Sequence, residues 1–215
     1  MDYPTAKVYI VDDEASVRRS LGRLLGVAGY DVESFDGADS FLRAGHAEVP
    51  GCVLLDLALP GRGGLDVQQA LLAAGPCPPI VFLSAQCDVY STVHAMKAGA
   101  VDFLTKPVEA RRLLGAIANA IRLDSAARAE RHSQLQIRTR IASLTRRETE
   151  VFEHVVQGRL NKQIAAELGT VEKTVKVHRA RVMQKMHVRT LAELVYLAIL
   201  AGVTPPHRTS RSLGH

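Results

Sequence analysis

The first half of the chain carries five polar side chains whose types suit phosphoryl chemistry. Asp12 and Asp13 follow one short apolar run, Asp56 follows a second, and Ser84 and Lys106 follow a third and a fourth. Clustered carboxylates repel one another unless a cation lies among them, and hard divalent cations such as Mg²⁺ bind carboxylate and carbonyl oxygens. Beside such a cation, one carboxylate can act as a nucleophile toward a phosphoryl group.

These side chains can meet only if the apolar runs are strands of one sheet. The sequence predicts strands near residues 7–11, 31–35, 52–56, 79–83 and 101–104, and helices near 15–28, 38–44, 65–74, 89–98 and from 109 onward. Regular alternation of strand and helix is typical of a parallel sheet that helices cover on both faces. Because the carboxyl ends of its strands share one edge, we expect the five side chains to converge there.

Each of these residues also has an ordinary explanation. An isolated Asp at a strand end is usually a helix cap or a solvated loop acid, and Asp13 could cap the helix near Glu14. Ser84 alone is more often a turn residue, and Pro60-Gly61 is typical of a turn. The functional interpretation therefore depends on all of these residues meeting at one edge of one sheet.

Charge divides the chain, which is 47% apolar and has a formal net charge of +5. Residues 1–121 contain 10 Lys and Arg against 14 Asp and Glu, a net charge of −4, whereas residues 122–215 contain 17 against 8, a net charge of +9. The split indicates that only the second half meets a polyanion, although compositional drift would also produce it.

The cysteines and the apolar segments indicate the compartment. Cys52, Cys77 and Cys87 are odd in number and show no C-x-x-C spacing, which argues against a disulfide framework or a zinc site. The N-terminus runs into a strand within a few residues, so no signal peptide is expected. No apolar stretch is long enough to span a bilayer, and we expect a cytoplasmic protein.

A helical linker is predicted after the first domain. Residues 113–141 are rich in helix formers, and Leu114, Ile117 and Ile121 keep helical spacing. Beyond Ile121 the pattern becomes polar, which predicts a long final helix that runs into a helical linker. The linker could pair with its counterpart in a dimer, although its heptad signal is too short to predict a coiled coil.

A basic helix after a tight turn then predicts a helix-turn-helix. Thr145 followed by Glu148 fits a capping box that opens one helix, and Asn161 is a candidate cap for a short second helix. Gly169 lies in the turn to a longer basic helix, and residues 191–201 are expected to form a fourth. Two helices joined by a Gly turn, the second strongly basic, are typical of DNA-binding proteins.

Helical spacing sorts the basic helix into two faces. The positions predicted to pack inward are Val171, Val175, His178, Val182 and Met186. The positions predicted to face DNA are Lys173, Lys176, Val177 and Ala180, with Arg179 and Arg181 on the flanks. Such a face can enter a major groove, with cations on phosphates and a few groups on base edges. The alternative is a solvated basic face on an ordinary helical bundle.

The first half resembles the receiver domain of bacterial response regulators. The fragments that carry the resemblance are V-D-D-E at 11–14, L-D-L-A-L-P-G at 55–61, F-L-S-A at 82–85, A-M-K-A-G-A at 95–100 and D-F-L-T-K-P at 102–107. The resemblance covers about the first 120 residues, the usual size of one domain. It implies a flavodoxin-like, doubly wound five-stranded parallel sheet of strand order 2-1-3-4-5.

The receiver resemblance implies a phosphoacceptor site. Asp56 would accept a phosphoryl group from a phosphohistidine of a sensor histidine kinase. Asp13 and Asp56 would hold Mg²⁺ together with the backbone carbonyl of Ala58, while Asp12 would act through water. Lys106 would bind a phosphoryl oxygen as a compact point charge.

The same resemblance implies a switch. Ser84 would donate a hydrogen bond to another phosphoryl oxygen and so report that the phosphate has arrived. Phe103 would be the coupled aromatic that turns inward. The peptide bond between Lys106 and Pro107 would be cis, as in the family.

The second half resembles the LuxR-type helix-turn-helix over most of residues 143–203. The resemblance is clearest in N-K-Q-I-A-A-E-L at 161–168 and T-V-K-V-H-R at 174–179. It implies that Lys176 and Val177 reach bases. The residues that would chiefly hold the DNA backbone are Lys173, Thr174, Arg179 and Lys185.

Together the halves resemble a response regulator of the NarL/FixJ type, a transcription factor switched by phosphorylation rather than an enzyme. The predicted class is α/β plus all-α: a receiver domain (1–121), a helical linker (122–142), a four-helix helix-turn-helix domain (143–203) and a disordered tail (204–215). Phosphorylation of Asp56 would repack the face around the fourth helix and fifth strand, so that two copies pair on pseudo-palindromic promoter DNA. RNA polymerase is a further candidate partner.

Two other classes of function stay open at this point. The first half could be a phosphatase that uses Asp56 as its nucleophile, which repeated turnover of a substrate would reveal. The basic half could be an RNA- or protein-binding module, which competition between duplex DNA and RNA would test.

Overall fold

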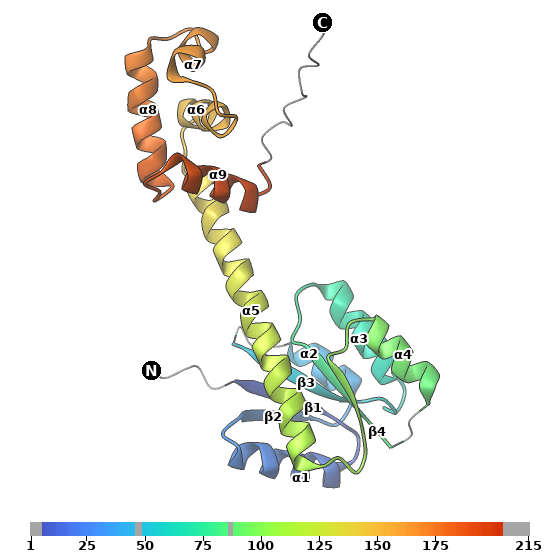
Figure 1. Ribbon diagram of the computed structural model, residues 1–215. Coiled ribbons are helices and arrows are strands. Elements are labelled where there is room, and N and C mark those ends of the chain that lie inside the picture. Colours follow the sequence, from blue (N-terminus) through green and yellow to red (C-terminus); the bar gives the residue numbers. More distant parts are fainter. Residues whose placement is uncertain (1–5, 46–48, 86–87, 204–215) are drawn as a thin grey trace, which may run out of the picture. The chain divides into compact units, whose positions relative to one another are not determined.

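The computed structural model describes residues 6–45, 49–85 and 88–203 (Figure 1). The chain divides into two compact units, a first unit of Met1–Ala129 and a second unit of Glu130–His215. Each unit has its own hydrophobic core. Cys87 and the tail of residues 204–215 lie outside the described residues.

The first unit is built on a parallel sheet of five strands in the predicted order β2-β1-β3-β4-β5. The strands are β1 (Lys7–Val11), β2 (Asp31–Phe35), β3 (Gly51–Asp56), β4 (Ile80–Ser84) and β5 (Asp102–Thr105). Their bounds agree with the predicted ranges to within one residue. Every residue of β3 and β4 is buried, as expected for central strands that helices cover on both faces.

Helices cover the two faces of this sheet in the doubly wound pattern (Figure 1). They are α1 (Ala15–Val27), α2 (Ala38–Ala44), α3 (Gly64–Ala74), α4 (Val89–Lys97) and α5 (Ala110–Ala142). On one face, α2, α3 and α4 pack around Phe41, Val67 and Phe82. On the other, α1 and α5 pack around Leu25 and Leu113. The alternation of strand faces thus produces two separate cores.

Strand register places the polar side chains at one edge. Val11 pairs with Leu55, so that the residues following β1 lie beside the end of β3. Asp56 pairs with Leu83, and the next residue of β4, Ser84, pairs with Thr105 at the end of β5. The carboxyl ends of β1, β3, β4 and β5 therefore meet where the sequence predicted.

A buried carboxylate, that of Asp124, extends the contact between α5 and the sheet of the first unit. Asp124 is 2% exposed, and its Oδ2 accepts hydrogen bonds from the Gly51 amide at 2.9 Å and from Arg128 Nε at 2.7 Å. A buried charge is tolerated when it is paired and hydrogen-bonded in this way. Asp124 therefore ties α5 to the first residue of β3, beyond Ile121, where the sequence predicted the linker to begin.

Among the described residues, the second unit contains the end of α5 and the four predicted helices, α6 (Arg146–Val156), α7 (Asn161–Glu167), α8 (Glu172–Lys185) and α9 (Leu191–Leu200). Their core includes Phe152, Ile164, Val182 and Leu194. Gly169 has a φ of +62°, so the turn between α7 and α8 uses a conformation that glycine adopts readily. Within the described part of the chain, no helix combines the length and apolarity needed to cross a membrane.

Two local predictions for the second unit were wrong. Val171 was expected to pack inward but is exposed, because it precedes α8 with an extended backbone and its side chain falls outside the helical face. Asn161 was a candidate cap for α7, but the cap residue is Leu160, and the Asn161 carboxamide oxygen accepts a hydrogen bond from Arg179 instead. By contrast, the capping box of Thr145 and Glu148 is confirmed.

Candidate functional site

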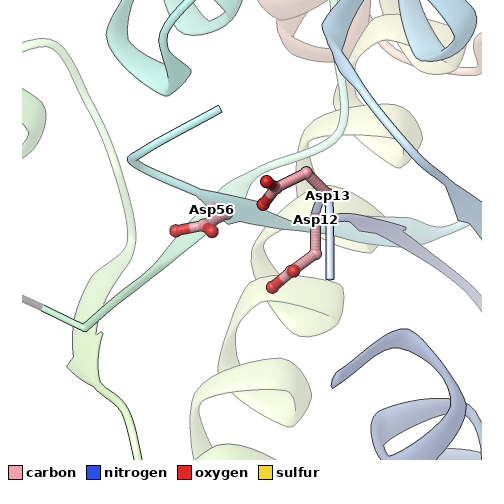
Figure 2. Close-up of side chains that lie close together, drawn as sticks. All are labelled: Asp12, Asp13 and Asp56. Carbon is pink, nitrogen blue, oxygen red and sulfur yellow. The ribbon is translucent and has the colours of Figure 1, made fainter. Parts of the chain in front are cut away.

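Three carboxylates converge at the carboxyl edge of the sheet (Figure 2). Asp12 and Asp13 follow β1, and Asp56 ends β3; one oxygen from each lies within 4.8 Å of the others. Asp12 and Asp56 are buried, whereas Asp13 is exposed. We call these three residues the acid cluster. Carboxylates this close repel one another unless a cation lies among them.

Lys106 supplies one positive charge to the acid cluster. Its Nζ lies 2.7 Å from Asp12 Oδ2 and 3.0 Å from Asp56 Oδ2. Burial disfavours the ammonium, but the hydrogen bonds and charges of the two carboxylates outweigh burial and raise the pKa of Lys106 above its ordinary value. One ammonium facing three carboxylates leaves an excess of negative charge.

The backbone holds Lys106 in this place. Its amide donates to the Ser84 carbonyl at 2.7 Å, which joins the residue after β5 to the end of β4. The Lys106-Pro107 peptide bond is cis, as predicted. The hydrogen bond to Ser84 holds Lys106 at the carboxyl ends of β4 and β5, from which its side chain reaches Asp12 and Asp56.

The donor set of the acid cluster fits Mg²⁺, which prefers oxygen ligands and is commonly bound by one or two carboxylates. The Ala58 amide donates to Asp56 Oδ1 at 3.3 Å, so the chain turns back beside Asp56 directly after β3. This turn brings the backbone of Ala58 close to the acid cluster, which is what its predicted role as a carbonyl ligand requires.

The structure adds two residues that the sequence interpretation missed. A Cβ atom on Gly64 would lie 2.4 Å from the Asp56 carbonyl oxygen, so only glycine lets α3 begin this close to the end of β3. Arg18 Nη1 donates to the carbonyl oxygens of Asp12 at 2.6 Å and Asp13 at 2.9 Å. Both contacts involve backbone oxygens, and residue types alone do not indicate them.

The two predicted switch residues lie on the strands β4 and β5, which follow β3 in the sheet. Ser84 is 2% exposed at the end of β4. Phe103 on β5 is 8% exposed, and its ring stacks on that of Phe82 with centroids 6.1 Å apart. Phe103 therefore occupies an inward position in the core that α4 covers.

In the second unit, α8 presents a polar face. Exposed positions on this helix include Lys173, Lys176, Val177, Ala180 and Arg181, while Thr174 and Arg179 are half-buried. The Lys176 ammonium lies 3.1 Å from the Glu172 carboxylate one turn earlier. Val175 and Val182 on the opposite face are fully buried, so the two predicted faces of the helix are present in its central part.

Lys185 differs from the other predicted DNA contacts. Its Nζ donates to Glu148 Oε2 at 2.6 Å and to the Ser143 carbonyl at 3.0 Å. The hydrogen bond from Lys185, followed by that from the Thr145 amide, outweighs burial and lowers the pKa of Glu148 to about 2. The Lys185 ammonium therefore joins α8 to the start of α6. Lys176 and Arg179 also have partners within the chain, Glu172 and Asn161, but Lys185 pairs with a buried carboxylate.

Comparison with known families defines the class of both units. Residues 8–118 match the response regulator receiver domain. Residues 142–198 match the bacterial regulatory proteins of the luxR family. A receiver domain followed by a LuxR-type domain defines a regulator of transcription with a DNA-binding helix-turn-helix.

Individual relatives agree over nearly the whole chain. The transcriptional regulatory protein FixJ of Bradyrhizobium diazoefficiens is 43% identical over 197 residues, which cover 91% of this chain and 96% of that protein. The response regulator protein TodT of Pseudomonas putida is 42% identical over 188 residues, 87% of this chain and 83% of TodT. The structure of the response regulator StyR has a TM-score of 0.84 at 46% identity and covers 91% of this chain and 98% of that one. The chain belongs to the response regulators of two-component systems.

Proposed function

We propose that the chain accepts a phosphoryl group on Asp56 from a phosphohistidine of a sensor histidine kinase. The observation that carries this proposal is the convergence of the acid cluster with Lys106 at one sheet edge. In the transfer, the P–N bond to the kinase imidazole breaks and a P–O bond to an Asp56 carboxylate oxygen forms. The electron pair of the broken bond returns to the imidazole, which takes up a proton.

Transfer of this kind needs positioning and charge neutralisation more than covalent chemistry. Mg²⁺, when bound, supplies much of that neutralisation. Asp13, Asp56 and the Ala58 carbonyl hold the ion in this proposal, and Asp12 holds it through water. Lys106, already within hydrogen-bond distance of Asp56, is placed to bind an oxygen of a phosphoryl group attached there.

The proposed output is a homodimer formed through α4 and β5. Ser84 donates a hydrogen bond to the phosphoryl group, and the packing of Phe103 transmits this change to the covering helix. The supporting observation is that α4 exposes a row of apolar side chains, Val89, Tyr90, Val93 and Met96. Pairing of two receivers would bury this row.

The proposed target of the dimer is pseudo-palindromic promoter DNA, with α8 of each copy in a major groove. Lys176 and Val177 would contact bases, and the cations of α8, together with Thr174, would contact the backbone. Residues 1–121, 122–142 and 143–203 would serve as receiver, linker and DNA-binding domain, with RNA polymerase as a further partner. A cytoplasmic location belongs to the same proposal, because promoter DNA is a partner.

The decisive experiment compares wild type with Asp56→Asn after incubation with acetyl phosphate and Mg²⁺. Intact-mass spectrometry should show one added phosphoryl group on wild type alone, and light scattering should show dimers only in that sample. Equal labelling of both proteins would contradict the assignment of Asp56. Repeated turnover of the phosphodonor, with no accumulation of labelled protein, would favour a phosphatase.

DNA binding is tested by fluorescence anisotropy on duplexes of different sequence. Lys176→Ala should weaken binding, and more so on the preferred sequence if this side chain contacts bases. An equal loss on all duplexes would reassign Lys176 to a phosphate contact. Better competition by RNA than by duplex DNA would contradict the proposed target.

A further inference from the structure

Arg18 lies on the first turns of α1, beside the acid cluster, and none of the roles proposed above involves it. A single nitrogen, Nη1, donates to two successive carbonyl oxygens, those of Asp12 and Asp13. Hydrogen bonds from a charged donor are stronger and shorter than neutral ones. Arg18 therefore holds the main chain at Asp12 and Asp13, which carries two of the three carboxylates of the acid cluster.

The two acids depend on this backbone to different degrees. The Asp12 carboxylate is held directly, because it accepts hydrogen bonds from the Glu14 amide at 2.9 Å and from Lys106. The Asp13 carboxylate is exposed, and among the residues that the structure describes no hydrogen bond or ion pair reaches it. Its direction toward Asp12 and Asp56 therefore depends on the main chain that carries it.

We propose that Arg18 is a positioning residue for the metal site: it holds the main chain at Asp12 and Asp13 so that the exposed Asp13 carboxylate stays within reach of the other two acids. This inference rests on the proposed Mg²⁺-dependent phosphoacceptor function. Preorganisation of a ligand strengthens binding, because less conformational freedom is lost when the ion enters.

Because Arg18 is positively charged, the direction in which its removal changes the Mg²⁺ affinity tests the inference. A guanidinium near a cation site repels the cation, so that a purely electrostatic Arg18 would weaken Mg²⁺ binding. A positioning Arg18 strengthens it. Removal of the side chain therefore has opposite effects under the two roles.

The experiment measures Mg²⁺ affinity of the full chain by calorimetry and Mn²⁺ affinity by electron paramagnetic resonance. Arg18→Ala should raise both dissociation constants about three- to tenfold, the effect expected for the loss of charge-assisted hydrogen bonds at a partly exposed site. Arg18→Lys should restore part of the affinity. Arg19→Ala, which removes the exposed neighbour, should leave it unchanged. Unchanged or tighter Mg²⁺ binding by Arg18→Ala would overturn the inference.

Two further measurements separate positioning from a general loss of structure. The Mg²⁺ concentration for half-maximal phosphorylation by acetyl phosphate should rise in Arg18→Ala, while the rate at saturating Mg²⁺ returns close to that of wild type. In an Asp13→Asn background, Arg18→Ala should have a smaller effect on Mg²⁺ affinity, because the group that it positions is gone. An undiminished effect there would overturn the route through Asp13. If wild type itself binds no Mg²⁺ and accepts no phosphate, the proposed function fails instead.

Discussion

Lys106 in the first unit and Lys185 in the second make the same type of contact in opposite settings. Lys106 donates to Asp12 and Asp56 while a third acid, Asp13, lies close by. Lys185 donates to Glu148, whose carboxylate also accepts from the Thr145 amide at 2.8 Å. The first unit thus has three carboxylates around one ammonium, and the second has one carboxylate whose charge and hydrogen bonds are matched.

The difference separates a site that needs a ligand from a contact that is complete. Excess negative charge is unfavourable until a cation binds, so the acid cluster favours the binding of one. The matched pair of Glu148 and Lys185 gains nothing from a ligand and fixes α8 against α6. Neutralising a carboxylate should therefore relieve the first unit and weaken the second.

The largest effect is expected from removing the cation of the first unit. Lys106→Met should lower the rate of phosphorylation by acetyl phosphate about 100-fold, because a preorganised charge at the developing phosphoryl oxygens is lost. Mg²⁺ should bind more tightly to this variant, because the competing ammonium is absent. Lys97→Met, which removes an exposed lysine of α4, is the matched control for the phosphorylation rate. A wild-type rate in Lys106→Met would refute the proposed contact of Lys106 with the phosphoryl group.

Breaking the matched pair should act on stability. Glu148→Gln should lower the free energy of unfolding of the second unit by about 2 kcal/mol, since the buried carboxylate that accepts from the half-buried Lys185 ammonium is lost. Chemical denaturation followed by circular dichroism measures the change. Lys185→Met should cost a similar amount, and the double variant should cost much less than the sum. Additive losses would show that the two side chains do not act as a pair.

The same pair predicts a dependence on pH. The pKa of Glu148 is lowered in the folded chain to about 2, from an ordinary value of 4.5. Stability from a lowered carboxylate pKa is present above the ordinary value and is lost as the pH falls toward the folded value. Between pH 5 and pH 3 the stability advantage of wild type over Glu148→Gln should shrink by about 1–2 kcal/mol. A difference that stays constant over this range would contradict the lowered pKa.

The fold and the acid cluster were accessible from the sequence because each rests on a local pattern. Apolar runs of four or five residues fix the strands, and parallel pairing then brings their carboxyl ends to one edge. Asp12, Asp56 and Lys106 could therefore be placed together although they are as much as 94 residues apart. The strand order came from the family resemblance, not from the pattern itself.

What the sequence did not indicate depends on packing between distant segments. Lys185 belongs to a basic helix in the sequence, and only the fold shows that Glu148, 37 residues away, binds its ammonium. Arg18 and Asp124 contact backbone groups, whose positions no residue pattern reveals. Val171 was misassigned because the helical spacing was extended to the residue that precedes α8.

The smallest effect on stability should come from Asp13→Asn. The sign of this effect tests most directly the comparison of the acid cluster with the pair of Glu148 and Lys185. Asp13→Asn removes one charge from the acid cluster without breaking a hydrogen bond known to hold that side chain, so without Mg²⁺ it should stabilise the first unit by about 0.5–1 kcal/mol. At saturating Mg²⁺ the order should reverse, because wild type is stabilised by binding an ion that the variant binds weakly. Thermal unfolding with and without Mg²⁺ measures both. Glu148→Gln is expected to destabilise the second unit. If Asp13→Asn likewise destabilises the first unit without Mg²⁺, the acid cluster has no excess negative charge for a cation to neutralise.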